Sequence, residues 1–199
     1  MCSSDLGNTA PVAVIDSPSS SLTWKVGDAI NFMGHATDAQ DGPLPASALT
    51  WSLIIHHCFT PADCHTHVIA NYTGVASGSF SAPDHAYPCW LELQLTATDS
   101  GGLTSTTSVR LDPKTVVLTF KTNPGGLVLD DLVVNEAART TPFSVTVVVG
   151  SANTVSAPSP QQFNKSTYYF SAWSDHGPQS HTVTAPAANT TYTATYRKH

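Results

Sequence analysis

Polar and apolar residues alternate with a period of two along most of this chain, a spacing typical of half-buried β-strands. Between positions 90 and 98, leucines at 91, 93 and 95 fall on one face, while Glu92, Gln94 and Thr96 fall on the other. No stretch repeats at the 3.6-residue spacing of an amphipathic helix. The alternation predicts strands at 12–15, 29–36, 48–56, 65–71, 77–81, 90–98, 103–111, 116–121, 126–129, 143–149, 154–157, 167–173, 181–185 and 192–196.

Turn residues divide these strands into two groups. Gly, Pro and Asp cluster at 41–43, 83–84 and 99–102 in the first group, and at 123–126 and 175–178 in the second. Seven short strands in about 100 residues is the pattern of an immunoglobulin-like sandwich. The prediction is therefore an all-β protein of two tandem β-sandwich domains, 9–113 and 114–199, the second being the smaller.

The first eight residues are expected to lie outside both domains. Positions 1–6 (MCSSDL) lack the basic and apolar regions of a signal peptide, and they match the translated end of a common sequencing adapter. We expect this leader to be non-native and the chain to be a metagenomic fragment. Its missing upstream part would then have held a signal sequence together with a catalytic domain.

Composition narrows the classes of function. Charged residues make up only 11% of the chain, against roughly 25% in ordinary soluble domains. The net charge is −6 and the basic residues are scattered. No basic stripe is present to neutralise phosphates, so nucleic-acid binding is not expected. No apolar run approaches the roughly 20 residues of a membrane-spanning helix, so no membrane span is expected either.

The turn sequences resemble those of a known family. Val26-Gly27-Asp28 and the runs 36–42 (ATDAQDG) and 95–103 (LTATDSGGL) look like the turns of PKD and related Ig-like domains of secreted bacterial proteins. The runs 24–28 (WKVGD), 56–58 (HHC), 64–67 (CHTH) and 82–85 (APDH) resemble a module found C-terminal to glucose/sorbosone dehydrogenase-like propellers. Residues 115–196, with SAPSP at 156–160 and WSD at 173–175, resemble the small β-repeat domain that follows it. The resemblance implies two Ig-like/PKD-like domains, a secreted location and an attached upstream enzyme.

The outward face of strand 90–98 is a candidate carbohydrate-binding surface. Trp90, Glu92 and Gln94 share that face, and an Ig-like sandwich would place His56 of the neighbouring strand beside them. An indole stacks on a pyranose ring while polar groups hold its hydroxyls. The alternative is that Trp90 covers the sheet edge or packs on the second domain.

Histidines and cysteines concentrate at positions 55–67, with four of the former and two of the latter. His65 and His67 are two apart and would point the same way on a strand. With His56 or His57 as a third ligand and His85 as a fourth, they would form a Zn²⁺ or Cu²⁺ site. The alternatives are a hydrogen-bonded cluster that orders a loop, or exposed histidines without a ligand.

The cysteine spacing predicts a cross-link at the same place. Cys58 and Cys64 flank a five-residue loop that contains Pro61, close enough for a disulfide, and such a bond suits an extracytoplasmic protein. Reduced thiols would instead permit a Cys/His zinc site. Cys89 is expected to be a buried, small apolar side chain.

Calcium and catalysis have weaker support. Asp38, Asp41 and Asp99 lie in predicted turns, where carboxylates bind Ca²⁺ in many extracellular β-domains, although Asp-Gly turns also form for backbone reasons alone. The chain lacks Gly-x-Ser-x-Gly, His-Glu-x-x-His and a glycine-rich phosphate loop. Neither Glu92 nor Glu136 has an obvious acidic partner for glycoside hydrolysis.

These observations favour a non-catalytic accessory module of a secreted protein, which binds a polysaccharide or positions an attached upstream catalytic domain on a polymer. A metal-binding domain with redox or hydrolytic activity at the histidines is the first alternative. A ligand-free spacer is the second.

Overall fold

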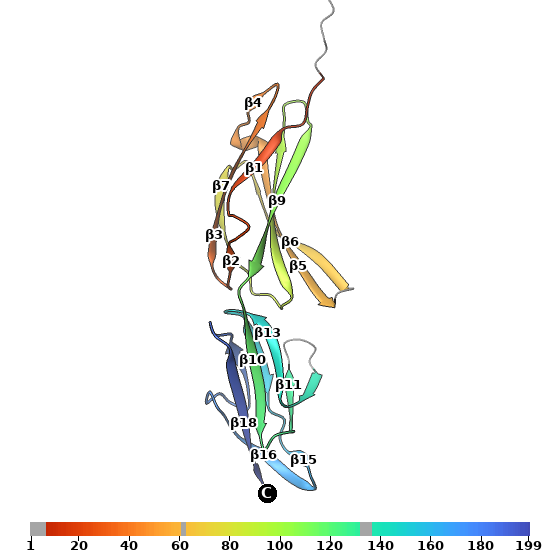
Figure 1. Cartoon of the computed structure of the whole chain (residues 1–199), viewed down its shortest axis with the longest axis vertical. Coiled ribbons are helices and arrows are strands. Elements are labelled where there is room, and N and C mark those ends of the chain that lie inside the picture. Colours follow the sequence, from red (N-terminus) through yellow and green to blue (C-terminus); the bar gives the residue numbers. More distant parts are fainter. Residues whose placement is uncertain (1–6, 61–62, 132–136) are drawn as a thin grey trace, which may run out of the picture. The chain divides into compact units, whose positions relative to one another are not determined.

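The computed structural model describes residues 7–60, 63–131 and 137–199, so positions 1–6 of the expected leader lie outside the described residues. The chain divides into two compact units. The first consists of Met1–Trp24, Asp28–Ala82 and Pro88–Pro113, and the second of Lys25–Gly27, Pro83–Tyr87 and Lys114–His199. Figure 1 shows both units built from strands, which confirms the all-β prediction.

The first unit contains two sheets. In one, β3 pairs with β1 on one side and with β4 and β7 on the other; the second has the order β2-β9-β8-β5-β6. A short 3-10 helix, Ala46–Ala48, precedes β5. The strands are β1 Val12–Ser17, β2 Thr23–Trp24, β3 Ala29–Asp38, β4 Gly42–Pro43, β5 Leu49–Thr60, β6 Asp63–Thr73, β7 Ser77–Ser81, β8 Cys89–Thr98 and β9 Thr104–Pro113.

The second unit also contains two sheets, with the orders β13-β10-β18-β16-β15 and β12-β11-β14-β17. The pairing of β10 with β18 is parallel, and the other pairings are antiparallel. The strands are β10 Thr115–Asn123, β11 Val128–Asp131, β12 Ala137–Thr140, β13 Phe143–Val148, β14 Ala152–Ser156, β15 Gln161–Phe163, β16 Ser166–Trp173, β17 Ser180–Thr184 and β18 Thr190–Lys198.

Alternation of burial positions the core of the first unit. Leu91, Leu93 and Leu95 on β8 are fully buried, as the period of two predicts. Phe32 of one sheet contacts Trp51 of the other, with ring centroids 4.7 Å apart. The indole N–H groups of Trp24 and Trp51 donate to backbone carbonyls at 3.0 Å, so neither buried ring carries an unpaired donor.

The core of the second unit is richer in β-branched and aromatic residues. It includes Leu118, Phe120, Val155 and Tyr196 together with Trp173, which is 2% exposed. Trp173 is therefore a core residue of this unit. Among the described residues, no helix has the length and apolar character of a membrane span.

Candidate functional site

The outward face of the β2-β9-β8-β5-β6 sheet collects polar side chains. On β8, Trp90, Glu92, Gln94 and Thr96 are partly buried and alternate with the buried residues of the core. His56 on β5 lies directly opposite Trp90 in the sheet register, and Arg110 on β9 lies opposite Glu92. The sequence placed Trp90, Glu92, Gln94 and His56 together on one face, and the structure does so too.

Trp90 stands between two other planar groups. The imidazole of His56 stacks on the indole, with centroids 4.6 Å apart and planes 11° apart. The guanidinium carbon of Arg110 lies 4.3 Å from the indole centroid. Because β5 and β9 flank β8 on opposite sides, the two groups cover opposite faces of the ring. The indole is outside the core, but its faces are not bare.

Glu92 is held as a carboxylate by its neighbours. Nε2 of His56 donates to Oε2 at 2.7 Å, and Nε2 of Gln94 donates to Oε1 at 3.1 Å. Partial burial alone would raise the pKa of Glu92. Hydrogen bonds from Gln94, Ser108 and His56 outweigh that effect, so the pKa lies below its ordinary value. A carboxyl group with a lowered pKa is unsuited to act as a general acid.

Neutral hydroxyl and amide groups extend this face away from Trp90. Ser52 donates to Oδ1 of Asn71 at 2.8 Å across β5 and β6, and the hydroxyls of Thr96 and Thr106 lie 2.8 Å apart across β8 and β9. The face therefore presents ordered groups that can both donate and accept hydrogen bonds.

Three of the predicted metal ligands lie on the opposite face. His57, His65 and His67 share the inward side of the β5–β6 hairpin, since His65 is opposite His57 and His67 is opposite Ile55. Nδ1 of His57 is 3.2 Å from Nε2 of His65, and the rings of His65 and His67 are 4.8 Å apart and perpendicular.

The remaining predicted ligands are elsewhere. His56 points to the outward face, and His85 belongs to the second unit, where its Nδ1 faces the carbonyl oxygen of Ala86 at 3.1 Å. Within the part of the chain that the structure describes, no group of three His, Cys, Asp or Glu residues is placed to hold a metal ion. The Zn²⁺ or Cu²⁺ site remains a prediction.

A disulfide joins Cys58 to Cys64 across the β5–β6 hairpin, as the spacing predicted. Pairing of β5 with β8 ends at His57 and Cys89, so the cross-link lies beyond the end of β8. Cys89 is buried, and burial raises the pKa of its thiol to about 11. It is therefore protonated and unreactive near neutral pH.

The three aspartates proposed for Ca²⁺ bind backbone and side-chain donors in turns. Oδ1 of Asp38 accepts from the amides of residues 40 and 41, Asp41 accepts from both the amide and the hydroxyl of Ser100, and Asp99 accepts from Asn8 and Leu103. Oδ2 of Asp38 is buried without a hydrogen-bond partner in the described structure. The calcium site also remains a prediction.

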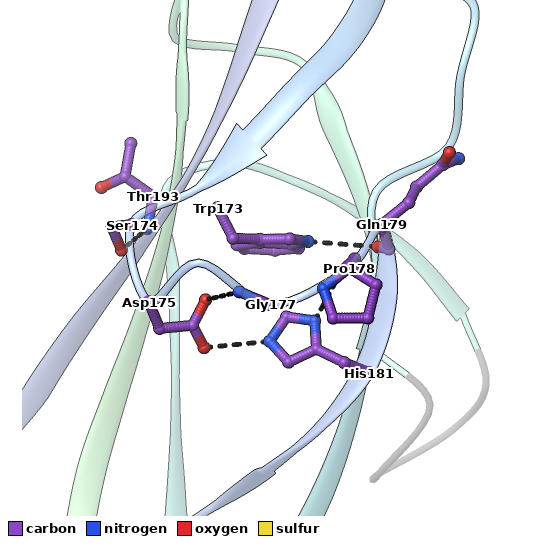
Figure 2. A network of polar contacts seen from close by, with 8 residues as sticks. All are labelled: Trp173, Ser174, Asp175, Gly177, Pro178, Gln179, His181 and Thr193. Carbon is purple, nitrogen blue, oxygen red and sulfur yellow. Dashed lines mark hydrogen bonds and ion pairs between the residues drawn. The ribbon is translucent and has the colours of Figure 1, made fainter.

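The second unit contains a polar network that the sequence did not single out (Figure 2). Nε2 of His181 donates to Oδ2 of Asp175 at 2.9 Å, and Nδ1 of His181 donates to the carbonyl of Pro178 at 2.8 Å. The amide of Gly177 donates to Oδ1 of Asp175 at 3.1 Å, and the ring of Trp173 meets the imidazole edge-on. Only its residue types, an Asp and a His six positions apart around a Gly-Pro turn, could have drawn attention to it.

The polar groups of this network bond to one another within the turn. Both imidazole nitrogens of His181 face oxygen acceptors of the same turn. Burial alone would raise the pKa of Asp175, but hydrogen bonds from His181 and Gly177 lower it below its ordinary value. The network closes the β16–β17 turn over Trp173, whose indole N–H donates to Gln179 at 3.1 Å.

Fold and site together define an all-β protein of two units with a polar, aromatic-centred sheet face on the first. No protein-family model matches the chain, and no curated protein matches it. Among solved structures, the chain is similar to Spo0M, a sporulation control protein from Bacillus subtilis, at 10% identity over 83% of this chain and 79% of that one. The TM-score is 0.34, which is too low to support a conclusion about fold or function.

Proposed function

We propose that this chain is a non-catalytic accessory module of a secreted bacterial protein, made of two Ig-like/PKD-like β-sandwich domains, and that it binds carbohydrate. One observation carries the proposal: Trp90 lies outside the core, on a sheet face that also carries His56, Arg110, Glu92 and ordered hydroxyl and amide groups. Such a face suits the neutral hydroxyls and apolar ring faces of a polysaccharide. The Cys58–Cys64 disulfide supports an extracytoplasmic location.

Arg110 covers the face of the Trp90 indole on which a sugar ring would stack, but few contacts hold the Arg110 side chain there. Its side chain is 58% exposed, and its other contact is an exposed ion pair with Asp112. An exposed cation–π contact contributes about 0.5–1 kcal/mol, and a surface ion pair about 0–1 kcal/mol. A sugar ring can therefore displace the guanidinium from the indole at a cost of about 1 kcal/mol, which corresponds to less than tenfold in affinity.

The test is polysaccharide binding by the whole chain in affinity electrophoresis and pull-down. Trp90→Ala should abolish binding, and Gln94→Ala should weaken it. Arg110→Ala should strengthen it severalfold because the indole face is uncovered. Tyr169→Ala, which removes an aromatic ring of the second unit that is 43% exposed, is the control and should bind normally.

The opposite result for Arg110 would contradict the stacking model. If Arg110→Ala abolishes binding and Trp90→Ala does not, this face recognises an anion through the guanidinium instead. If no polysaccharide is retained by the unmodified chain, a spacer that positions an attached enzyme becomes the better description.

A metal-binding function is the second candidate, favoured by the 3.2 Å approach of His57 to His65 with His67 alongside. Elemental analysis of purified protein, with His67→Ala as the matched variant, tests it. Near-stoichiometric Zn or Cu that is lost in the variant would support it, and metal-free protein would refute it.

A further inference from the structure

The second unit contains a half-open cavity of about 280 Å³. Its walls come from three segments: residues 84–87, residues 146–148 at the end of β13, and residues 151–154 at the start of β14. All three belong to the second unit. The volume lies near the lower end of the roughly 300–1,000 Å³ of small-molecule pockets, and it suits a single ring rather than a polymer.

Asn153 supplies an acceptor at this cavity. The residue is 2% exposed, and its Nδ2 donates to both the carbonyl and the hydroxyl oxygen of Ser151, at 2.8 and 3.0 Å. Both amide hydrogens are therefore committed. Among the described residues, none donates a hydrogen bond to Oδ1 of Asn153. This oxygen is also not among the side-chain atoms that are fully buried without a partner, so it remains accessible. Asn153 lines the cavity, so this oxygen has the capacity to accept a hydrogen bond from a ligand donor.

Asp84 places a second acceptor on the same wall. Its Oδ2 accepts from the backbone amide of Ala152 at 3.0 Å, which fixes the carboxylate beside β14. A carboxylate accepts hydrogen bonds at both oxygens, so Oδ1 has capacity for a ligand hydroxyl. Two acceptors on one wall favour a ligand with several donors and disfavour an anion.

The rest of the lining has the two other features that a sugar needs. Tyr87 is 40% exposed at the cavity, where its ring can contact the apolar face of a pyranose. Thr146, Ser151 and Thr154, whose hydroxyls can both donate and accept, are among the lining residues, as are the apolar Val147 and Val148. A neutral, hydroxyl-rich ring satisfies all these groups together.

We propose that this cavity binds one neutral sugar residue, with Asn153 and Asp84 accepting from its hydroxyls and Tyr87 lying against its ring. The site is independent of the sheet face around Trp90. It would recognise an isolated or terminal sugar, whereas the sheet face would recognise the flank of a polymer.

The experiment is ligand-observed NMR and calorimetry on the full chain with glucose, galactose, mannose and N-acetylglucosamine. At least one sugar should bind with a Kd of about 1 mM, typical of small polar ligands with few contacts. Asp84→Asn and Tyr87→Ala should each weaken it about tenfold, and Tyr87→Phe should restore binding because the ring is retained. Tyr169→Ala is the control and should leave it unchanged, and Trp90→Ala serves to assign the binding to this cavity or to the sheet face.

Three results would overturn the proposal. The first is that none of the sugars binds. The second is that binding is lost in Trp90→Ala but kept in Asp84→Asn, which would assign it to the sheet face. The third is that inorganic phosphate competes for the site, which would mark it as an anion site. The first result leaves polysaccharide retention by the Trp90 face untouched, so the two proposals fail separately. Unfolding curves of each variant distinguish lost binding from lost fold.

Discussion

The His56–Glu92 pair of the first unit and the His181–Asp175 pair of the second have similar lengths, 2.7 and 2.9 Å, but different surroundings. His56 reaches Glu92 from a neighbouring strand, across a flat face, and makes one hydrogen bond to the described residues. His181 uses both nitrogens inside a turn and is packed against Gly177 and Trp173. A histidine–carboxylate contact alone therefore says little about function. The unused hydrogen-bonding capacity around it says more.

The largest effect on stability should come from disrupting the packing around the His181–Asp175 pair. A Cβ at Gly177 would lie 2.5 Å from Nε2 of His181, and the ring cannot move away without losing Asp175 or Pro178. We expect Gly177→Ala to lower the free energy of unfolding of the second unit by up to about 3 kcal/mol. Gly125→Ala is the matched control, since the nearest atom to its Cβ would be 4.0 Å away. Equal stabilities of the two variants in urea unfolding would refute this packing.

Removing each histidine sharpens the comparison. His181→Ala deletes two hydrogen bonds at an imidazole that is only 11% exposed, and should cost the second unit about 2 kcal/mol. His56→Ala deletes one hydrogen bond at a more exposed ring and leaves Trp90 covered by Arg110. It should cost the first unit less than about 1 kcal/mol. Chemical denaturation followed by tryptophan fluorescence measures both, and a larger loss for His56→Ala would reverse the assignment of roles.

Reduction of the Cys58–Cys64 disulfide tests how far the first unit, which contains the His56–Glu92 pair, depends on this cross-link for its stability. Cys58 and Cys64 are six positions apart, and closing so short a loop stabilises a fold by about 2 kcal/mol in the chain-entropy account. Reduction should therefore lower the stability of the first unit by no more than that and leave the second unit unchanged. Calorimetry with and without reductant measures the effect, and a shift of the second unit's transition would contradict it.

The smallest effect concerns pH. Both carboxylates have folded-state pKa values below their ordinary values of 4.5 for Glu92 and 3.8 for Asp175. Each carboxylate therefore stabilises the folded state at pH values above its ordinary pKa. This contribution is lost as the pH falls through the lowered pKa of the folded state. Urea unfolding between about pH 3 and pH 7 should show a flatter profile for Glu92→Ala in the first unit and for Asp175→Ala in the second. Unchanged profiles would mean that neither pair is linked to folding.

The sequence was sufficient to predict the strands and their inward and outward faces wherever apolar and polar residues alternate with a period of two. Each strand expected from alternation overlaps an observed one, and parity placed Trp90, Glu92 and Gln94 outward and the leucines of β8 inward. The strands that were missed, β2, β4, β12 and β15, have two to four residues, too few to show alternation.

What the sequence could not reveal depends on three-dimensional packing. Arg110 covers Trp90 because of the register between β8 and β9, which no local pattern encodes. The His181 network requires a turn in which His176 adopts a positive φ of 65° and Gly177 admits the imidazole. The cavity at Asn153 depends on residues 84–87 being placed beside β14, far away in the sequence.

The parallel pairing of β10 with β18 has a mechanical consequence. Both strands run in the same direction, and their register extends from Leu118 opposite Thr190 to Asn123 opposite Thr195. A tension applied between the start of β10 and the end of β18 would pull the two strands past each other along their length. All the hydrogen bonds of the ladder would then resist together in shear, instead of opening one after another as in a peeled hairpin. A pulling force applied between these two ends should therefore meet more resistance than one that peels a hairpin apart.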